Sequence, residues 1–338
     1  MRLRYVATRV VASALMAVAA TLVVFLIAHS VPADPILAQL GDKASANPET
    51  VARFRARWAL DRPLWAQYGI FLARLAQGDL GESIASRRPV LADIAQYAPA
   101  TIELATLAAV LTLLAGVPLG VLAAVKRDTW LDHATRLGCL VGVSAPTFWL
   151  AFIVLALFYG GLEIAPSPGR LDAGAVPPLP VTGLFLADSL LAGDWATLRS
   201  ALAHMVLPAA VLAASTVGLI TRTTRAAMLE VLGQDYIRVA RAKGLTEGGV
   251  VGGHAVPNAL IPVVTLGGLA YAELLAGTVL TETIFSWPGL GRYTYQSAIA
   301  LDFPAIMGVT LLVAVVYLAM NFAVDLSYLW LDPRVARR

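Results

Sequence analysis

Residues 100–125 read ATIELATLAAVLTLLAGVPLGVLAAV, an almost unbroken apolar run that contains a single carboxylate, Glu103. A helix of about 20 apolar residues is long enough to cross the hydrocarbon core of a bilayer. The segment therefore predicts a transmembrane helix. Five further segments of similar length and composition occur in the chain, at residues 9–29, 137–159, 203–221, 258–280 and 305–329.

The composition of the whole chain agrees with a membrane protein. Of its 338 residues, 58% are apolar and only 14% are charged, whereas soluble domains are about one quarter charged. The sequence thus predicts an all-α, polytopic membrane protein with six transmembrane helices. The first segment has some features of a signal peptide, but its apolar run is long and five more spans follow it, which favours a retained helix.

Several classes of chemistry are not indicated by the residue pattern. The chain has one cysteine, Cys139, and four scattered histidines, so we expect no internal disulfide, no metal site and no cofactor. It lacks the GxxxxGK[ST] phosphate loop and the HExxH and GxSxG motifs, so we expect no ATP hydrolysis or other enzymatic activity by this chain alone. A net charge of +3 does not indicate a nucleic-acid surface.

Basic residues of the short loops predict the orientation, because cytoplasmic loops carry an excess of Lys and Arg. They gather at both chain ends and in the loops after the second and fourth spans. These residues are Arg2, Arg4, Arg9, Lys126, Arg127, Arg136, Arg222, Arg225, Arg238, Arg241, Lys243, Arg334, Arg337 and Arg338. Both termini are therefore expected in the cytoplasm.

The predicted organisation has three parts. These are a first transmembrane helix at residues 1–29, an external helical cap at 30–99, and a five-helix core at 100–338 that includes a cytoplasmic loop at 222–257. In the external part, aromatic and leucine residues recur at near-helical spacing after a helix start at Asp61 and Pro63. It can be a cap packed on the membrane domain, a docking platform for an external partner, or both. The Pro- and Gly-rich segment 160–202 predicts a second external loop.

Three carboxylates lie inside predicted spans, where ionisable groups are costly and are functional candidates. Glu103 lies near the external end of its span and Asp325 near the cytoplasmic end of its own. Glu273 is the deepest, which makes it the candidate for lining a translocation path. Each of the three can instead be neutral or hydrogen-bonded between helices.

Residues 235–245, DYIRVARAKGL, form an unusually charged stretch between two apolar spans. Asp235 begins it, Arg241 and Lys243 end it, and Gly244 follows. An acid at the start, cations at the end and a glycine after them are typical of a short, capped helix. The stretch therefore predicts a cytoplasmic helix at a loop tip.

One face of this predicted helix carries Tyr236, Val239, Ala240 and Lys243. Because Ala240 is small, the face would allow another protein to approach closely. The alternative is a helix that lies on the membrane surface and is held there by Arg238 and Arg241. The residues themselves leave both interpretations open.

The same region resembles the cytoplasmic signature of ABC importer permeases, Glu-Ala-Ala-x3-Gly-x9-Ile-x-Leu-Pro, in which Ala240, Gly244 and Pro257 fit the pattern. QDYIRVARAKGL (234–245) and HAVPNALIPVVTL (254–266) are similar to the dipeptide, oligopeptide and nickel importer branch. So are HSVPADPILAQLG, LDRPLWAQY, GDLGES, PATIELA, GVPLGVLAAVKR, ETIFSWPGLGRYTYQSAIALDFPAIMG and DLSYLWLDPRV. These segments occur in the expected order over nearly the whole chain.

The resemblance implies a type I ABC importer permease in a bacterial inner membrane that carries a small peptide or related solute. It implies three kinds of partner: a paralogous permease that forms a heterodimer with this chain, two ATPase subunits, and an external substrate-binding protein. It also implies that the ATPase contact consists of Asp235, Tyr236, Arg238, Val239, Ala240, Arg241, Lys243 and Gly244. Glycines after this stretch, and Pro257 in place of a frequent Arg, indicate a less electrostatic contact than is usual in the family.

Two other classes remain open on the residues alone. An ion-coupled secondary transporter would use Glu103, Glu273 and Asp325 and would need no ATPase. A membrane scaffold would have no transport path at all. The charged helix at 235–245 has no role in the first of these alternatives.

Overall fold

The computed structural model describes residues 2–30, 48–49, 51–52, 61–276 and 278–331. Within these ranges the chain is built of helices, and its β-pairing is limited to one isolated bridge between Glu82 and Pro89. The predicted all-α class is confirmed. The parts of the predicted external cap at residues 31–47, 50 and 53–60 lie outside the described residues, as do residues 332–338 at the C-terminal end.

Five helices are long and apolar enough to cross a membrane, and each corresponds to a predicted span. They are α1 (Arg2–Ser30), α5 (Val90–Val125), α9 (Trp195–Leu232), α12 (Val256–Ala276) and α15 (Phe303–Leu331). Several are longer than predicted. The helix α5 begins at Val90 rather than at residue 100, so the last ten residues of the predicted external segment are part of the second span. The 38 residues of α9 extend about 57 Å at 1.5 Å per residue.

The third predicted span, 137–159, is broken rather than straight. It consists of α6 (Trp130–Ser144) and α7 (Thr147–Leu155), the latter continued by the π-helix η1 (Ala156–Gly161), with a bend of 98° between the two halves. Pro146 causes the break, because it has no backbone N–H and keeps the preceding residue out of the helical region. Ala145 is accordingly extended, with φ −77° and ψ 126°. The described part of the chain thus has five possible spans, or six if the bent pair counts as one.

The second predicted external loop, 160–202, is only partly a loop. It contains α8 (Phe185–Ala192), and α9 already begins at Trp195. The Asp194 carboxylate caps α9 by accepting a hydrogen bond from the backbone N–H of Thr197 at 3.0 Å. The loop prediction was wrong here because the Pro- and Gly-rich composition ends at Pro180, before these helices begin.

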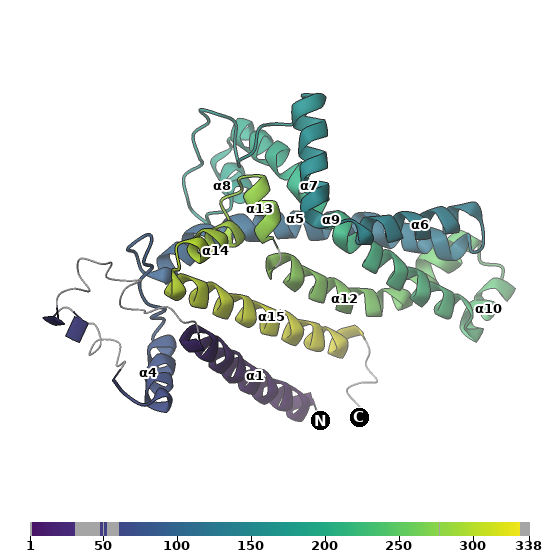
Figure 1. Ribbon diagram of the computed structural model, residues 1–338. Helices are drawn as coiled ribbons and strands as arrows, with labels where there is room; N and C mark the ends of the chain where they lie inside the picture. Colours follow the sequence, from purple (N-terminus) through teal and green to yellow (C-terminus); the bar gives the residue numbers. More distant parts are fainter. Residues whose placement is uncertain (1, 31–47, 50, 53–60, 277, 332–338) are drawn as a thin grey trace.

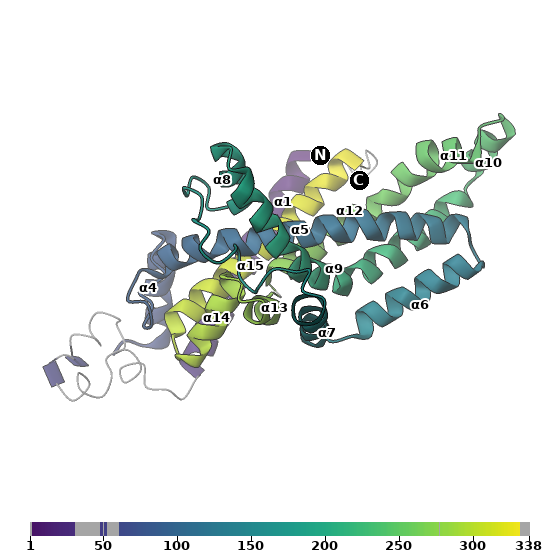
Figure 2. The same cartoon turned by 90° about the horizontal axis from the view of Figure 1, so that it is seen from above.

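The centre of the molecule is the contact between α5 and α9 (Figures 1 and 2). A Cβ atom placed on Gly116 would lie 2.9 Å from the side chain of Ile220, and one on Gly120 would lie 2.6 Å from that of Thr224. The two glycines therefore let the helix backbones approach closely.

Shorter helices complete the bundle. They are α4 (Leu64–Ala76), α10 (Asp235–Ala242), α11 (Glu247–Gly249), the π-helix η2 (Val250–Ala255), α13 (Val279–Ile284) and α14 (Leu290–Ile299). The helix α4 packs its aromatic face on α1, with the Tyr68 ring 5.3 Å from that of Phe25.

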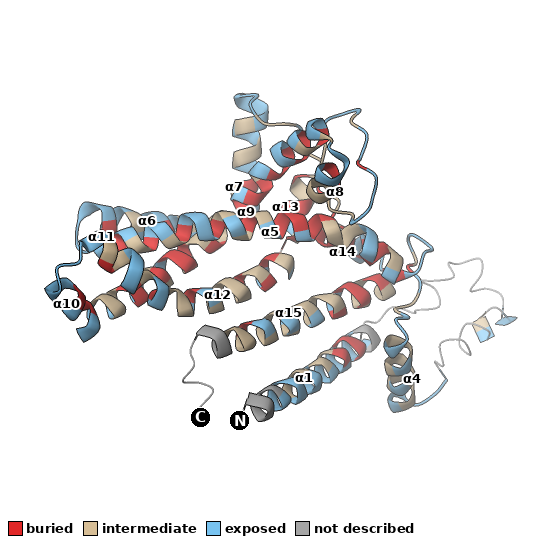
Figure 3. Cartoon of the chain, turned by 180° about the vertical axis from the view of Figure 1, so that it is seen from behind, coloured by how far each residue is buried: buried red, intermediate tan, exposed pale blue. Residues whose placement is uncertain are grey.

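Apolar side chains also cover much of the outer surface. Exposed residues lie along α1 and α6 (Figure 3), and they include Leu15, Leu137 and Leu140, each more than half exposed. Such a surface is suited to lipid or to another apolar subunit, and not to water.

Candidate functional site

The short charged helix predicted within residues 235–245 is confirmed as α10, which spans Asp235–Ala242. It lies at the end of the bundle far from α4 and α14 (Figures 1 and 2). Gly244 follows it with φ +82°, the left-handed conformation that ends a helix at little cost for glycine. The guanidinium of Arg241 then binds the carboxylate of Glu247 at 2.7 Å and closes the turn, and this hydrogen bond raises the pKa of Arg241.

The buried face of α10 rests on the protein's own core. Ile237 is fully buried and Ala240 is 7% exposed. Both belong to a cluster, called here the α10 seat, whose other buried members are Ala124, Ala227, Met228, Val250, Ala255 and Ala259. The seat joins residues near the end of α5 and the end of α9 to η2 and the start of α12. The helix α10 is therefore attached to the bundle by apolar packing.

This seat corrects the predicted interaction face. Tyr236 and Val239 are 44% and 53% exposed, but Ala240, predicted on the same outward face, is turned toward the chain's own core. The sequence did not distinguish the two faces: Ile237 and Ala240 are apolar and three residues apart, and so are Tyr236 and Val239. The outward surface of α10 instead combines two apolar side chains with the exposed Asp235, Arg238, Arg241 and Lys243.

Two of the three carboxylates in the predicted spans have basic partners. Glu103 is buried and binds the guanidinium of Arg170 at 2.6 Å, and it also accepts the backbone N–H of Leu186 at 2.5 Å. Asp325 lies 3.2 Å from Arg9. Glu273 differs, because its side chain on α12 is exposed between the buried Ala272 and Leu274. The structure does not bring the three carboxylates together.

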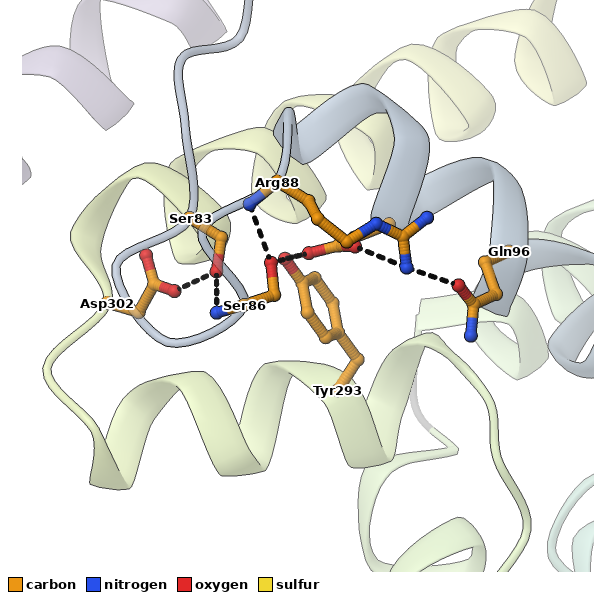
Figure 4. Close-up of polar contacts among 7 residues, drawn as sticks. Ser83, Ser86, Arg88, Gln96, Tyr293 and Asp302 are labelled. Carbon is orange, nitrogen blue, oxygen red and sulfur yellow. Dashed lines mark hydrogen bonds and ion pairs between the residues drawn. The ribbon is translucent and has the colours of Figure 1, made fainter.

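The end of the bundle opposite α10 is held by a polar network (Figure 4). The Ser83 hydroxyl donates to the buried Asp302 carboxylate at 2.5 Å, and the Tyr293 hydroxyl donates to Asp93 at 3.1 Å. Arg88 lies 3.4 Å from the same Asp93 carboxylate. These bonds attach the segment before α5 to α14 and to the start of α15.

Residues 116–337 match the family described as binding-protein-dependent transport system inner membrane component, and residues 2–105 match the N-terminal region of such membrane components. The chain belongs to this family. It is a permease subunit of an ABC importer and a multi-pass membrane protein, as the resemblance implied. This family membership favours the permease interpretation over the secondary-transporter and scaffold alternatives.

Individual relatives are similar over almost the full length. A probable D,D-dipeptide transport system permease protein of Escherichia coli K12 is 48% identical over 315 residues, which cover 93% of this chain and 92% of that protein. A dipeptide transport system permease protein of the same organism is 41% identical over 320 residues, 94% of each chain. The methionine ABC transporter MetNI, in an inward-facing form, shares the fold with a TM-score of 0.50 and 19% identity, covering 69% of this chain and 93% of that one.

Proposed function

We propose that this chain forms half of the translocation path of a dipeptide importer. Its partners are a related permease, two ATPase subunits and an external substrate-binding protein, and α10 inserts its outward face into an ATPase subunit. The relatives named for dipeptide transport support the substrate class. The observation that carries the coupling role is the construction of α10: its apolar face is occupied by its own seat, while Tyr236 and Val239 stay exposed.

Exposed apolar side chains on a short, charged helix favour contact with a protein. A helix that lies on a membrane turns its apolar face to the lipid and its cations to the headgroups. Here the apolar stripe of α10, Ile237 and Ala240, is already buried inside the chain. The outward face instead has two apolar residues, Tyr236 and Val239, surrounded by charged ones. This composition is typical of a protein interface, which has an apolar centre and a polar rim.

Reconstitution tests the function as a whole. The chain is coexpressed with a related permease and the two ATPase subunits, and the complex is reconstituted in proteoliposomes. The binding protein and a radiolabelled D-alanyl-D-alanine or L-alanyl-L-alanine probe are then added. We expect uptake that depends on ATP and on every subunit. Uptake that persists without the ATPase subunits contradicts the proposal.

The proposed orientation places α10 and both termini in the cytoplasm. In a Cys139→Ser background, an impermeant maleimide added to intact cells should label Val176→Cys but not Lys243→Cys. Val176 is 79% exposed in the loop before α8, and Lys243 is exposed at the end of α10. After the membrane is permeabilised, both positions should be labelled. The reverse pattern in intact cells excludes both the orientation and the coupling role of α10.

Glu273 is the proposed charged residue of the translocation path. A carboxylate that hydrogen-bonds an ammonium group contributes about 1.5–3 kcal/mol, so Glu273→Gln should lower uptake of a dipeptide probe by about tenfold or more. Copurification of the ATPase should remain at the parent level. The matched control is Glu230→Gln, which changes an exposed carboxylate on α9. Unchanged uptake by Glu273→Gln removes this residue from the path.

A further inference from the structure

An ion pair between Asp132 and Arg225, near the α10 seat, has no role in the site described so far. The carboxylate of Asp132, at the start of α6, is fully buried. Arg225 on α9 binds both of its oxygens, with Nε to Oδ1 at 2.7 Å and Nη2 to Oδ2 at 2.6 Å. The backbone N–H of Asp128 adds a third bond at 3.1 Å. A bidentate pair fixes orientation as well as distance, because the planar guanidinium matches the carboxylate in one geometry.

The pair lies beside the surface that carries α10. Arg225 comes two and three residues before Ala227 and Met228, the α9 members of the α10 seat. All three therefore occupy the same stretch of about one helical turn. A displacement of α10 that moves this turn of α9 also moves the guanidinium of Arg225.

The other end of α6 is also fixed to α9. A Cβ atom on Gly218 of α9 would lie 2.7 Å from the Val143 side chain and 3.0 Å from the carbonyl oxygen of Cys139, both on α6. The helix α6 is thus joined to α9 by close backbone packing near its end and by the ion pair at its start. We therefore expect α6 to follow α9 as long as both attachments hold.

The bend at Ala145 and Pro146 begins directly after this attachment. Beyond it, α7 packs through Ala151 against Val211 of α9 and Phe285 after α13. Because Pro146 has no N–H to continue the helical hydrogen bonds, the helical ladder does not fix the angle between the two halves of the broken span. A rotation of α6 therefore changes the 98° bend and reaches α7 and Phe285.

We propose that Asp132 and Arg225 are positioning residues that transmit movement of α10 to α6 and to the bend at Pro146. This inference rests on the proposed coupling role of α10. The pair suits transmission because the Asp132 carboxylate is fully buried and the Arg225 side chain is only 20% exposed, so the carboxylate cannot exchange its cation for water at little cost. An exposed pair, such as Arg127 with Asp128 at 64% and 70% exposure, exchanges its partner for water at little cost.

Spin-label distances across the bend test the proposal without knowledge of the solute. Labels are placed at Leu140→Cys on α6 and Phe152→Cys on α7, both more than half exposed, in a Cys139→Ser background. The label-to-label distance is measured in the complete complex without nucleotide and after trapping with ATP and vanadate. The parent should show a shift between the two states. Asp132→Asn and Arg225→Gln should lose most of that shift while the ATPase still copurifies.

The matched control, Arg127→Gln, should keep the full shift. A shift that persists in Asp132→Asn or Arg225→Gln overturns the proposal, and so does a parent without any shift. If those two variants do not assemble, the same distance change is measured in Arg225→Lys, which keeps the positive charge but not the bidentate hydrogen bonding. An undiminished distance change in Arg225→Lys overturns the proposal. An ATPase that does not copurify with the parent contradicts the proposed function instead, so the two failures are distinguishable.

Discussion

Replacing Val239 by glutamate is expected to release the ATPase from the permease while the permease itself folds normally. Val239 is 53% exposed on the outward face of α10, so a carboxylate there is hydrated in the free chain. In the assembled importer it would be buried without a partner, which is costly. A residue at the centre of an interface contributes about 2 kcal/mol or more, so the affinity should fall by about 30-fold or more. Copurification of the ATPase and thermal stability of the permease are measured together.

The corrected position of Ala240 provides the contrast. Ala240→Glu places a carboxylate in the apolar α10 seat, so it should lower the unfolding temperature of the permease itself, which Val239→Glu should not. Val176→Glu, the same chemical change at an exposed valine in the loop before α8, should affect neither quantity. The membrane-surface alternative predicts that Arg238→Gln and Arg241→Gln have the larger effects, and it is supported if Val239→Glu keeps the ATPase bound.

Replacing Glu282 by alanine should prevent stable folding of the membrane bundle. Glu282 is fully buried and accepts hydrogen bonds from the hydroxyls of Thr101 at 2.6 Å and Thr278 at 2.9 Å and from the backbone N–H of Arg292 at 3.0 Å. Each buried donor left without an acceptor costs about 1–3 kcal/mol. The sum of three such costs is comparable with the whole stability of an average domain, about 5–15 kcal/mol.

The location of Glu282 explains why the loss should be global. Thr101 belongs to α5, and its oxygen also accepts the backbone N–H of Leu290 at 2.8 Å, while the indole N–H of Trp287 donates to the Ala100 carbonyl at 2.9 Å. The chain between α13 and α14 is thus tied to the central helix. The yield of monodisperse protein in detergent and its unfolding temperature measure the effect. Glu230→Ala, at an exposed carboxylate, should leave both unchanged, and wild-type stability of Glu282→Ala would contradict this account.

Glu282 was not predicted as a structural residue. It lies just beyond a predicted span, in ETIFSWPGLGRY, and no local pattern shows that its partner Thr101 comes from α5, 181 residues earlier. The same holds for Asp132 with Arg225 and for Glu103 with Arg170. A pattern of spacing identifies neighbours on one helix, but pairs that join different helices depend on how those helices pack.

The sequence by itself determined the class of the protein and the approximate positions of its long membrane-spanning helices. Apolar runs of about 20 residues have one stable solution in a bilayer, a helix that satisfies its own backbone hydrogen bonds, so five of the six predicted spans appear as continuous helices. The cap and stop of α10 are equally local, because they depend on a terminal acid, terminal cations and Gly244. Tertiary structure alone decided which face of α10 stays free, since Ala240 and Val239 differ only in whether α9, η2 and α12 cover them. It also decided which carboxylates are paired, because burying a charge is tolerated only where packing brings an opposite charge or several donors within hydrogen-bonding distance.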